Sequence, residues 1–351
     1  MSDKNNTLLI LTPGFAKDES DTTCIPLQQI FLRAIKENYS QVNIIIISFQ
    51  YPFETGTYQW HGMNVISFGG KNKDGLRRRL LWQRVNKKLK KIASEEKIIG
   101  VLSFWCSESA LIGKKFADAH GLRHLCWISG QDARKENRSV EKIKPRADEL
   151  VGLSDFILDE FEKNHGVRPA HIIPPGIDTR YFDPVLPEKD IDLLSVGSLI
   201  KLKQYDVFLE VIATIKKKLP NIKAVLIGEG SEKERLEQLI FTLGLEKNVT
   251  LAGELPHREV LKVMQRSKVF LHTSSYEGFG VVCIEALYAG SSVISFCKPM
   301  KEEIKNWHIV DSAEEMGKNA IDLLEKDQNI ELVLFNSIVN TAKKFMGLFG
   351  Y

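Results

Sequence analysis

Short apolar runs alternate with longer amphipathic segments along the first half of the chain. Residues 8–11, 42–48, 98–104 and 124–128 are apolar runs that predict strands, and residues 27–37 have the spacing of an amphipathic helix between two of them. Strands that helices cover on both faces are continuously apolar. The first half therefore predicts a parallel sheet of the α/β class.

The same alternation restarts after residue 183. Strands are expected at residues 191–196, 224–227, 249–251, 269–272 and 292–295. A proline-rich stretch, residues 168–187, separates the halves, as linkers between domains often do. We expect an N-terminal domain over residues 1–182, a linker near 183–190, and a C-terminal domain over 183–351 whose last helix returns to the first domain. Two such doubly wound domains would face each other across a deep cleft, at the carboxyl ends of their strands.

Bulk properties of the 351 residues limit the classes of protein to consider. No apolar run approaches the roughly 18 residues of a membrane-spanning helix, and the polar N-terminus leads directly into the first predicted strand, which predicts a cytoplasmic protein. The five cysteines are an odd number without CxxC spacing, which predicts reduced thiols. The eight histidines include no uninterrupted i, i+4 pair, so no metal site is predicted.

The segment with most chemical information is residues 269–290, VFLHTSSYEGFGVVCIEALYAG. It predicts a strand, a glycine-bearing turn and a helix that begins near Gly280 or Val281. The first amide groups of a helix have no partner within it and attract phosphate. Glu277 lies in the turn and Glu285 about two helical turns later, so one ligand could contact both carboxylates.

The spacing of these two glutamates, with Phe279 and Gly280 after the first, resembles the signature of the retaining glycosyltransferase family 4, which has the GT-B fold of two Rossmann-like domains. Upstream, VGSLIKLKQ is similar to the family's strand-end glycine and phosphate-binding lysine, which would be Lys203. Further blocks that resemble the family are LIGEG at 226–230, LAG at 251–253 and IIPPGID at 172–178.

The resemblance implies a nucleotide-sugar donor and no further cofactor. It implies that Lys203 and the turn at Phe279, Gly280 and Val281 hold the donor diphosphate, that Glu285 binds the ribose and that Glu277 contacts the sugar. It also implies metal-independent transfer to a hydroxyl with retention of anomeric configuration. The acceptor is expected to be a glycan or a lipid-linked glycan.

Two departures from the family pattern stand out. Ser198 occupies the position after the glycine where the family often has arginine, and Ser129-Gly130-Gln131-Asp132 replaces an HGxD-like segment, so the usual histidine is missing. Asp132 is then the nearest polar candidate for orienting the acceptor or the sugar. Gly14, at the end of the first strand, is a candidate for close backbone approach to the donor phosphates.

Other interpretations stay open beside this one. Glu277 and Glu285 could be solvated acids, and the departures at Ser198 and Ser129 would suit a catalytically silent nucleotide-sugar-binding protein. A sugar phosphorylase or sugar-phosphate synthase of the same fold is a further alternative. The DxD-like residues 190–192 precede a strand, away from its ligand-binding end, and are expected to be structural.

Positive charge is concentrated in residues 71–91, which hold ten Lys or Arg and one acid, Asp74. Leu81, Val85, Leu89 and Ile92 recur at near-helical spacing within and just after this segment, and Trp82 adjoins them. A basic amphipathic helix predicts peripheral contact with the inner face of an anionic membrane. A helix packed on the sheet with a solvated basic face has the same pattern. Nucleic acid is not an expected partner, because the net charge of the whole chain is only +3.

Overall fold

The computed structural model describes residues 6–326 and 330–351, which form two compact units. The first comprises residues up to Pro175 together with Ile338–Tyr351, and the second is Gly176–Ser337. The division lies before the expected boundary at residue 182. Residues 177–183 are tied to the second unit, since the Ile177 amide donates to the Asn336 carbonyl and the Asp183 amide donates to the Gln265 side chain.

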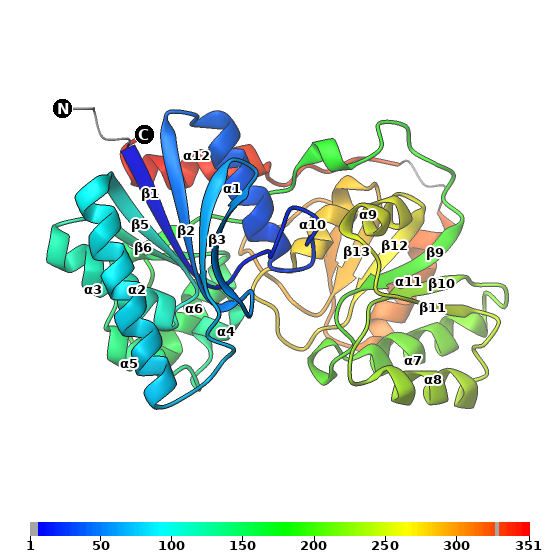
Figure 1. Cartoon of the computed structure of the whole chain (residues 1–351). Helices are drawn as coiled ribbons and strands as arrows, with labels where there is room; N and C mark the ends of the chain where they lie inside the picture. The colour runs from blue at the N-terminus through cyan, green and yellow to red at the C-terminus, as the bar shows by residue number, and fades with distance from the viewer. Residues whose placement is uncertain (1–5, 327–329) are drawn as a thin grey trace. The chain divides into compact units, whose positions relative to one another are not determined.

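The first unit is built on an eight-stranded sheet in the order β3-β4-β2-β1-β5-β6-β7-β8, in which only β3 runs antiparallel to its neighbour (Figure 1). Its strands are β1 (Asn6–Gly14), β2 (Val42–Tyr51), β3 (Thr55–Trp60), β4 (Met63–Phe68), β5 (Lys97–Phe104), β6 (His124–Ile128), β7 (Leu150–Gly152) and β8 (His171–Ile172). Its helices are α1 (Pro26–Asn38), α2 (Leu76–Glu95), α3 (Glu108–His120), α4 (Gly130–Ala133), α5 (Ser139–Ile143), α6 (Asp155–His165) and α12 (Ile338–Leu348).

The last helix, α12, completes the first unit by packing on α1 (Figure 1). Phe345 of α12 lies 5.0 Å from Phe31 of α1 and 4.9 Å from Trp127 of β6, measured between ring centroids. Phe345 and Phe31 are fully buried. Burial of such large rings stabilises a domain by several kcal/mol, ~3–5 for a phenylalanine, so the C-terminal residues belong to the core of the first unit.

The second unit has a six-stranded parallel sheet in the order β11-β10-β9-β12-β13-β14. Its strands are β9 (Ile191–Val196), β10 (Ala224–Ile227), β11 (Val249–Gly253), β12 (Ser267–His272), β13 (Ser292–Ser295) and β14 (Trp307–Ile309). Its helices are α7 (Tyr205–Lys216), α8 (Lys233–Thr242), α9 (His257–Gln265), α10 (Val281–Tyr288) and α11 (Ala313–Glu325). The predicted strands of both halves and the α/β class are confirmed. The DxD-like acids flank the start of β9, where Asp190 pairs with Arg266 and Asp192 with Lys268.

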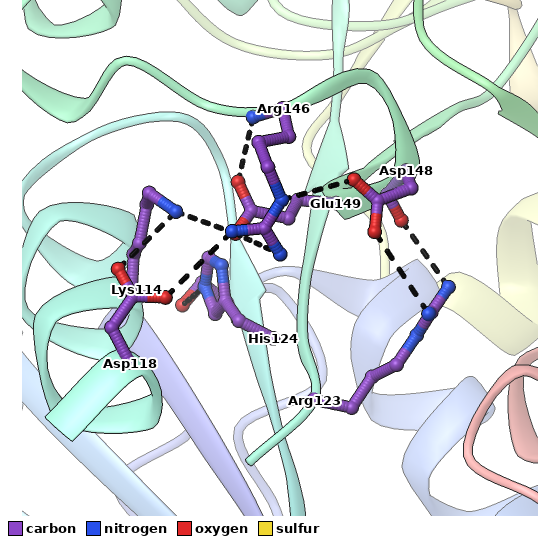
Figure 2. A network of polar contacts seen from close by, with 8 residues as sticks. Lys114, Asp118, Arg123, His124, Arg146, Asp148 and Glu149 are labelled. Atoms are coloured by element: carbon purple, nitrogen blue, oxygen red, sulfur yellow. Dashed lines mark hydrogen bonds and ion pairs between the residues drawn. The ribbon is translucent and has the colours of Figure 1, made fainter. Parts of the chain in front are cut away.

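A charged network lies at the amino ends of β6 and β7 in the first unit, opposite the carboxyl ends of these strands (Figure 2). Its centre is Glu149, 1 % exposed, whose carboxylate lies 2.6 Å from Lys114 Nζ and 3.1 Å from the Arg146 guanidinium. Asp118 and Asp148 extend it through further ion pairs. A buried carboxylate is tolerated only when it is paired, so the network has a structural explanation.

Helix α2 turns its predicted apolar stripe inward. Leu81, Val85, Leu89 and Ile92 are buried in the core of the first unit, and the indole N–H of Trp82 donates to Glu108 at 2.7 Å. The four stripe residues are therefore unavailable to a membrane, contrary to the use expected for the stripe, whereas Trp82 is only partly buried. The outer face keeps exposed basic residues and two exposed leucines, Leu76 and Leu80. Within the described ranges, every helix is too short or too polar to span a membrane.

Candidate functional site

The strand order of the second unit reverses between β9 and β12. From β9 the chain proceeds outward to β10 and β11, then returns to the other side of β9 through β12 and continues to β13 and β14. Open α/β sheets bind ligands at such a reversal, beside the carboxyl ends of the strands. The loop after β9 carries Lys203 and the loop after β12 carries Glu277, so the topology brings these two predicted residues together.

Backbone and side-chain bonds fasten the two loops to each other. The Thr273 hydroxyl donates to the Lys203 carbonyl at 2.7 Å, and the Ser275 amide donates to the Leu202 carbonyl at 3.1 Å. Lys203 Nζ lies 2.5 Å from Glu277 Oε2, with both side chains partly accessible. The lysine expected at the diphosphate and the glutamate expected at the sugar form a direct ion pair.

Glycines shape the strand ends beside this pair. A Cβ on Gly228, at the end of β10, would lie 1.9 Å from the carbonyl oxygen of Gly197, at the end of β9, so no other residue fits there. Gly280 has φ +81° and precedes Val281, the first residue of α10. The turn thereby presents the amino end of α10 beside Glu277, as a phosphate-binding turn requires.

Glu277 is held in its ionised form. Burial raises the pKa of Glu277, but the neighbouring His272 imidazole and the charge of Lys203 outweigh burial and bring this pKa to about 2. His272 Nε2 lies 3.6 Å from Glu277 Oε2. His272 itself is 3 % exposed, and its burial lowers the pKa of the imidazole. A neutral histidine and a charged lysine therefore face one carboxylate.

Glu285, in the second turn of α10, has a different partner. Its Oε1 lies 2.7 Å from Nε2 of His257, the first residue of α9. Burial lowers the pKa of His257, but the hydrogen bond to Glu285 and its charge outweigh this effect and raise the pKa. Neither His257 nor His272 was expected at the site. His272 ends a strand next to the motif and so carried a positional signal, whereas His257 is brought to Glu285 only by the packing of α9 on α10.

The remaining predicted site residues of the second unit differ in how exposed their side chains are to solvent. Ser198 is exposed directly after Gly197. Val281 is partly accessible at the start of α10. The Phe279 side chain is 2 % exposed and packs against Phe335 at 5.4 Å, so only the backbone of Phe279 is available to a ligand.

The first unit has its own strand reversal, between β1 and β5, and a pocket of about 490 Å³ lies there. Gly14 at the end of β1 and Trp105 and Cys106 after β5 line it, with Gln131, Asp132 and Arg134 from α4 and the residue after it. Trp105 has φ +65°, a conformation that is rare for a bulky side chain and is often found at functional sites. The reversal thus combines backbone, aromatic and polar groups suited to a polar ligand.

Asp132 faces away from open solvent in this pocket wall. Its Oδ1 accepts the Cys106 amide at 2.7 Å and its Oδ2 accepts the Ser129 amide at 2.7 Å. Burial raises the pKa of Asp132 to about 7, although the bonds from Ser129 and Cys106 lower it. Both carboxylate oxygens of Asp132 already accept backbone N–H groups. Asp132 therefore stabilises the loop after β5, which lines the pocket.

Neither unit offers a cluster of metal ligands within residues 6–326 and 330–351, where no three His, Cys, Asp or Glu side chains gather around one point. The positive charges beside Glu277 and the α10 amino end come from Lys203 and the backbone. Chemically, the second unit combines a cation, a helix amino end and two oriented carboxylates. This set can hold a diphosphate and stabilise negative charge that grows on it.

Residues 177–344 match the family described as glycosyl transferases group 1. The chain is similar to a subunit of the phosphatidylinositol N-acetylglucosaminyltransferase of Arabidopsis thaliana, with 32% identity over 153 residues, 42% of this chain and 34% of that protein. It also resembles the Campylobacter jejuni N-acetylgalactosamine-N,N'-diacetylbacillosaminyl-diphospho-undecaprenol 4-alpha-N-acetylgalactosaminyltransferase, with 31% identity over 161 residues, 44% of this chain and 43% of that protein. The chain spans about a third of the length of the first of these relatives.

The fold extends the similarity to the whole chain. The solved structure of HepE from Anabaena, in complex with UDP and glucose, matches 98% of this chain and 99% of its own at a TM-score of 0.69 and 16% sequence identity. The expected fold is therefore confirmed over both units. Residues 177–344 thus resemble the glycosyl transferases group 1 family, in a chain with the GT-B fold.

Proposed function

We propose that this protein transfers a sugar from a nucleotide-sugar donor to a hydroxyl group of a glycan or lipid-linked glycan, with retention of anomeric configuration and without a metal ion. The observation that carries the proposal is the Lys203–Glu277 ion pair at the strand reversal, next to the amino end of α10, the helix that carries Glu285. The group 1 family match and the UDP and glucose bound to the Anabaena structure support it.

In this proposal the donor diphosphate lies at Lys203 and the amides near Gly280 and Val281, while Glu285 accepts hydrogen bonds from the ribose. As the bond between the anomeric carbon and the diphosphate oxygen breaks, Lys203 stabilises the charge on the leaving nucleotide. The acceptor oxygen forms the new bond from the same face, and its proton passes to the leaving phosphate oxygen. The products are a glycoside and a nucleoside diphosphate, and no metal takes part in any step.

Glu277 is proposed to contact the sugar. Its ionised carboxylate lies beside Lys203, so it can orient sugar hydroxyls and stabilise positive charge at the anomeric carbon. The pocket of the first unit, with Gly14 and Trp105 and braced by Asp132, is proposed to receive the acceptor, because aromatic faces and polar side chains suit a sugar ring.

The acceptor is proposed to be attached to a lipid and to be reached at an anionic membrane surface. Two relatives are named for acceptors with a lipid part, phosphatidylinositol and diphospho-undecaprenol. The outer face of α2 adds exposed basic residues, each worth about 1 kcal/mol close to such a surface. In this proposal the basic side chains of residues 71–91 attract the membrane, and the apolar stripe takes no part because it is buried.

A catalytically silent nucleotide-sugar-binding protein is the second candidate, because Ser198 stands where the family often has arginine. A panel of nucleotide sugars and nucleoside diphosphates in a thermal-shift assay tests the shared donor site. One donor should raise the melting temperature of the wild type, since a ligand present at 100 times its Kd stabilises by about 2.7 kcal/mol. Glu285→Ala should abolish the shift and the exposed-residue control Glu246→Ala should keep it; no shift with any donor would contradict both candidates.

A further inference from the structure

The hydrogen bond between His257 and Glu285 joins two helices that are adjacent in space. His257 opens α9 and Glu285 lies in α10, and their side chains are only 20% and 13% exposed. Hydrogen bonds to a charged acceptor are stronger than neutral ones, most of all where water is largely excluded. Nε2 of His257 therefore fixes one oxygen of the carboxylate, Oε1, in a defined position.

The second oxygen of this carboxylate is left for a ligand. Oε2 of Glu285 has no hydrogen-bond partner within the parts of the chain that the structure describes. A carboxylate binds two neighbouring hydroxyl groups more tightly when its plane is fixed before the ligand arrives, because an unfixed side chain loses rotational freedom on binding. The bond from His257 supplies this restraint.

The orientation of the His257 ring is itself set by its neighbours. Tyr181 packs edge-on against it, with ring centroids 6.0 Å apart at 61°. The guanidinium of Arg258 lies over the same Tyr181 ring, at 5.1 Å from its centroid. The three residues come from α9 and from the 3₁₀ turn Thr179–Tyr181, so packing determines which way Nε2 points.

We propose that His257 is a positioning residue for the ribose of the donor nucleotide: it holds the Glu285 carboxylate so that this group can receive the ribose hydroxyls. The proposal rests on the donor site proposed above and adds a residue to it. Loss of His257 should impair only one part of donor binding: the recognition of ribose hydroxyls should weaken, and the diphosphate contacts at Lys203 should stay unchanged.

The test is a calorimetric titration of the full-length protein with the nucleoside diphosphate that best stabilises it in a panel of UDP, GDP, ADP and TDP, and with its 2′-deoxy or ribo counterpart. The variants are His257→Leu, which removes the hydrogen-bond donor, and His257→Gln, whose amide can restore it. Glu285→Gln is the reference for a damaged ribose contact, and His308→Leu on β14 is a control for loss of a half-buried histidine.

The wild type should prefer the ribonucleotide, and His257→Leu should weaken ribonucleotide binding by about tenfold, as expected for loss of a charged hydrogen bond. The same variant should lose most of the preference for ribose over deoxyribose, His257→Gln should regain much of it, and His308→Leu should resemble the wild type. The preference is a ratio measured within one variant, so it does not depend on the folded fraction.

Two results would overturn the proposal in distinguishable ways. If Glu285→Gln impairs ribose recognition while His257→Leu keeps the wild-type affinity and preference, the donor site stands and the role of His257 is wrong. If no nucleoside diphosphate binds the wild type, the donor site itself is wrong and the role of His257 with it.

Discussion

Glu277 is the residue whose surroundings most closely match a role in the chemical step. It is ionised, because Lys203 and His272 oppose the effect of its burial, and its pKa is about 2. Glu277→Gln keeps the size of the side chain and removes the charge. We expect kcat of sugar transfer to fall by about 100-fold, as for loss of one preorganised electrostatic contact, while donor affinity changes little because Lys203 and Glu285 remain.

Nucleotide release and donor titration measure these two quantities separately. The control is Glu246→Gln, an exposed acid of the same unit. A Glu277→Gln enzyme with wild-type kcat would exclude Glu277 from the chemistry, whereas a large loss of donor affinity at unchanged kcat would assign it to ground-state binding.

His124 supplies a pH-dependent prediction about stability. It is 4 % exposed, Nε2 lies 3.0 Å from the Ser103 hydroxyl, and Nδ1 has no partner within the described residues. Burial, together with the positive charges of Lys114 and Arg146, lowers the pKa of His124 from 6.5 to about 3. The unfolded chain therefore binds a proton that the folded chain does not, so the stability from neutral His124 is complete above pH 6.5 and declines toward about pH 3.

The free energy of unfolding should fall more steeply with acid for the wild type than for His124→Gln, by up to about 1.4 kcal/mol per pH unit. Urea unfolding at pH 7.5, 6 and 5 measures the two slopes, with the exposed-residue variant His120→Gln as control. Parallel pH profiles for the wild type and His124→Gln would show that His124 is not buried in neutral form.

The candidate site residues differ in whether the sequence alone could identify them. Lys203, Glu277 and Glu285 could be predicted because each lies in a local motif at a strand end or helix start. His257 could not, since its partner Glu285 is 28 residues away and only packing brings them together. Asp132 was identified from its place in a motif, yet the motif could not show that backbone amides occupy both of its oxygens.

At the scale of elements, the buried parallel strands were predictable because helices cover both of their faces, so their central residues are mostly apolar. The strands β3, β7, β8 and β14 were missed for physical reasons, and β4 was missed as well. β3 is an edge strand with mostly exposed side chains, and β7, β8 and β14 have only two or three residues. Hydrogen bonds to neighbouring strands define such short segments, and a hydrophobic pattern cannot.

Helix α2 carries the membrane prediction. The variant that tests it reverses exposed basic residues and spares Arg78, which pairs with Asp74 at 2.8 Å. We expect binding to anionic liposomes at low salt to be lost, because the attraction is electrostatic and screened within about 10 Å at 0.1 M salt. The four substitutions are to glutamate, at Arg77, Arg79, Lys87 and Lys90.

Liposome flotation measures this binding, and binding to neutral liposomes serves as the reference. The matched control changes the same net charge elsewhere, by glutamate substitution of four exposed lysines, Lys217, Lys247, Lys318 and Lys344. If the α2 variant and the control float equally with anionic liposomes, α2 is an ordinary packed helix with a solvated basic face and does not bind the membrane.

At the scale of the whole molecule, the sequence predicted two α/β units and the return of the last helix, which the structure places in the first unit. Both candidate ligand regions lie where a sheet reverses its strand order, β1 with β5 in one unit and β9 with β12 in the other. The fold therefore explains why motifs far apart in the chain converge at strand carboxyl ends. In the proposed function, the loops of the first unit would select the acceptor, and no motif in these loops identifies it.

The proposed function is sugar transfer that depends on Lys203 and on no metal. The most direct measurement is nucleoside diphosphate release from the stabilising nucleotide sugar, with a panel of glycan and polyprenyl-diphosphate acceptors in EDTA, for the wild type and Lys203→Ala. We expect acceptor-dependent release that persists in EDTA and falls about 100-fold or more in Lys203→Ala. Release by Lys203→Ala at the wild-type rate, or wild-type activity that EDTA abolishes and manganese restores, would contradict this expectation.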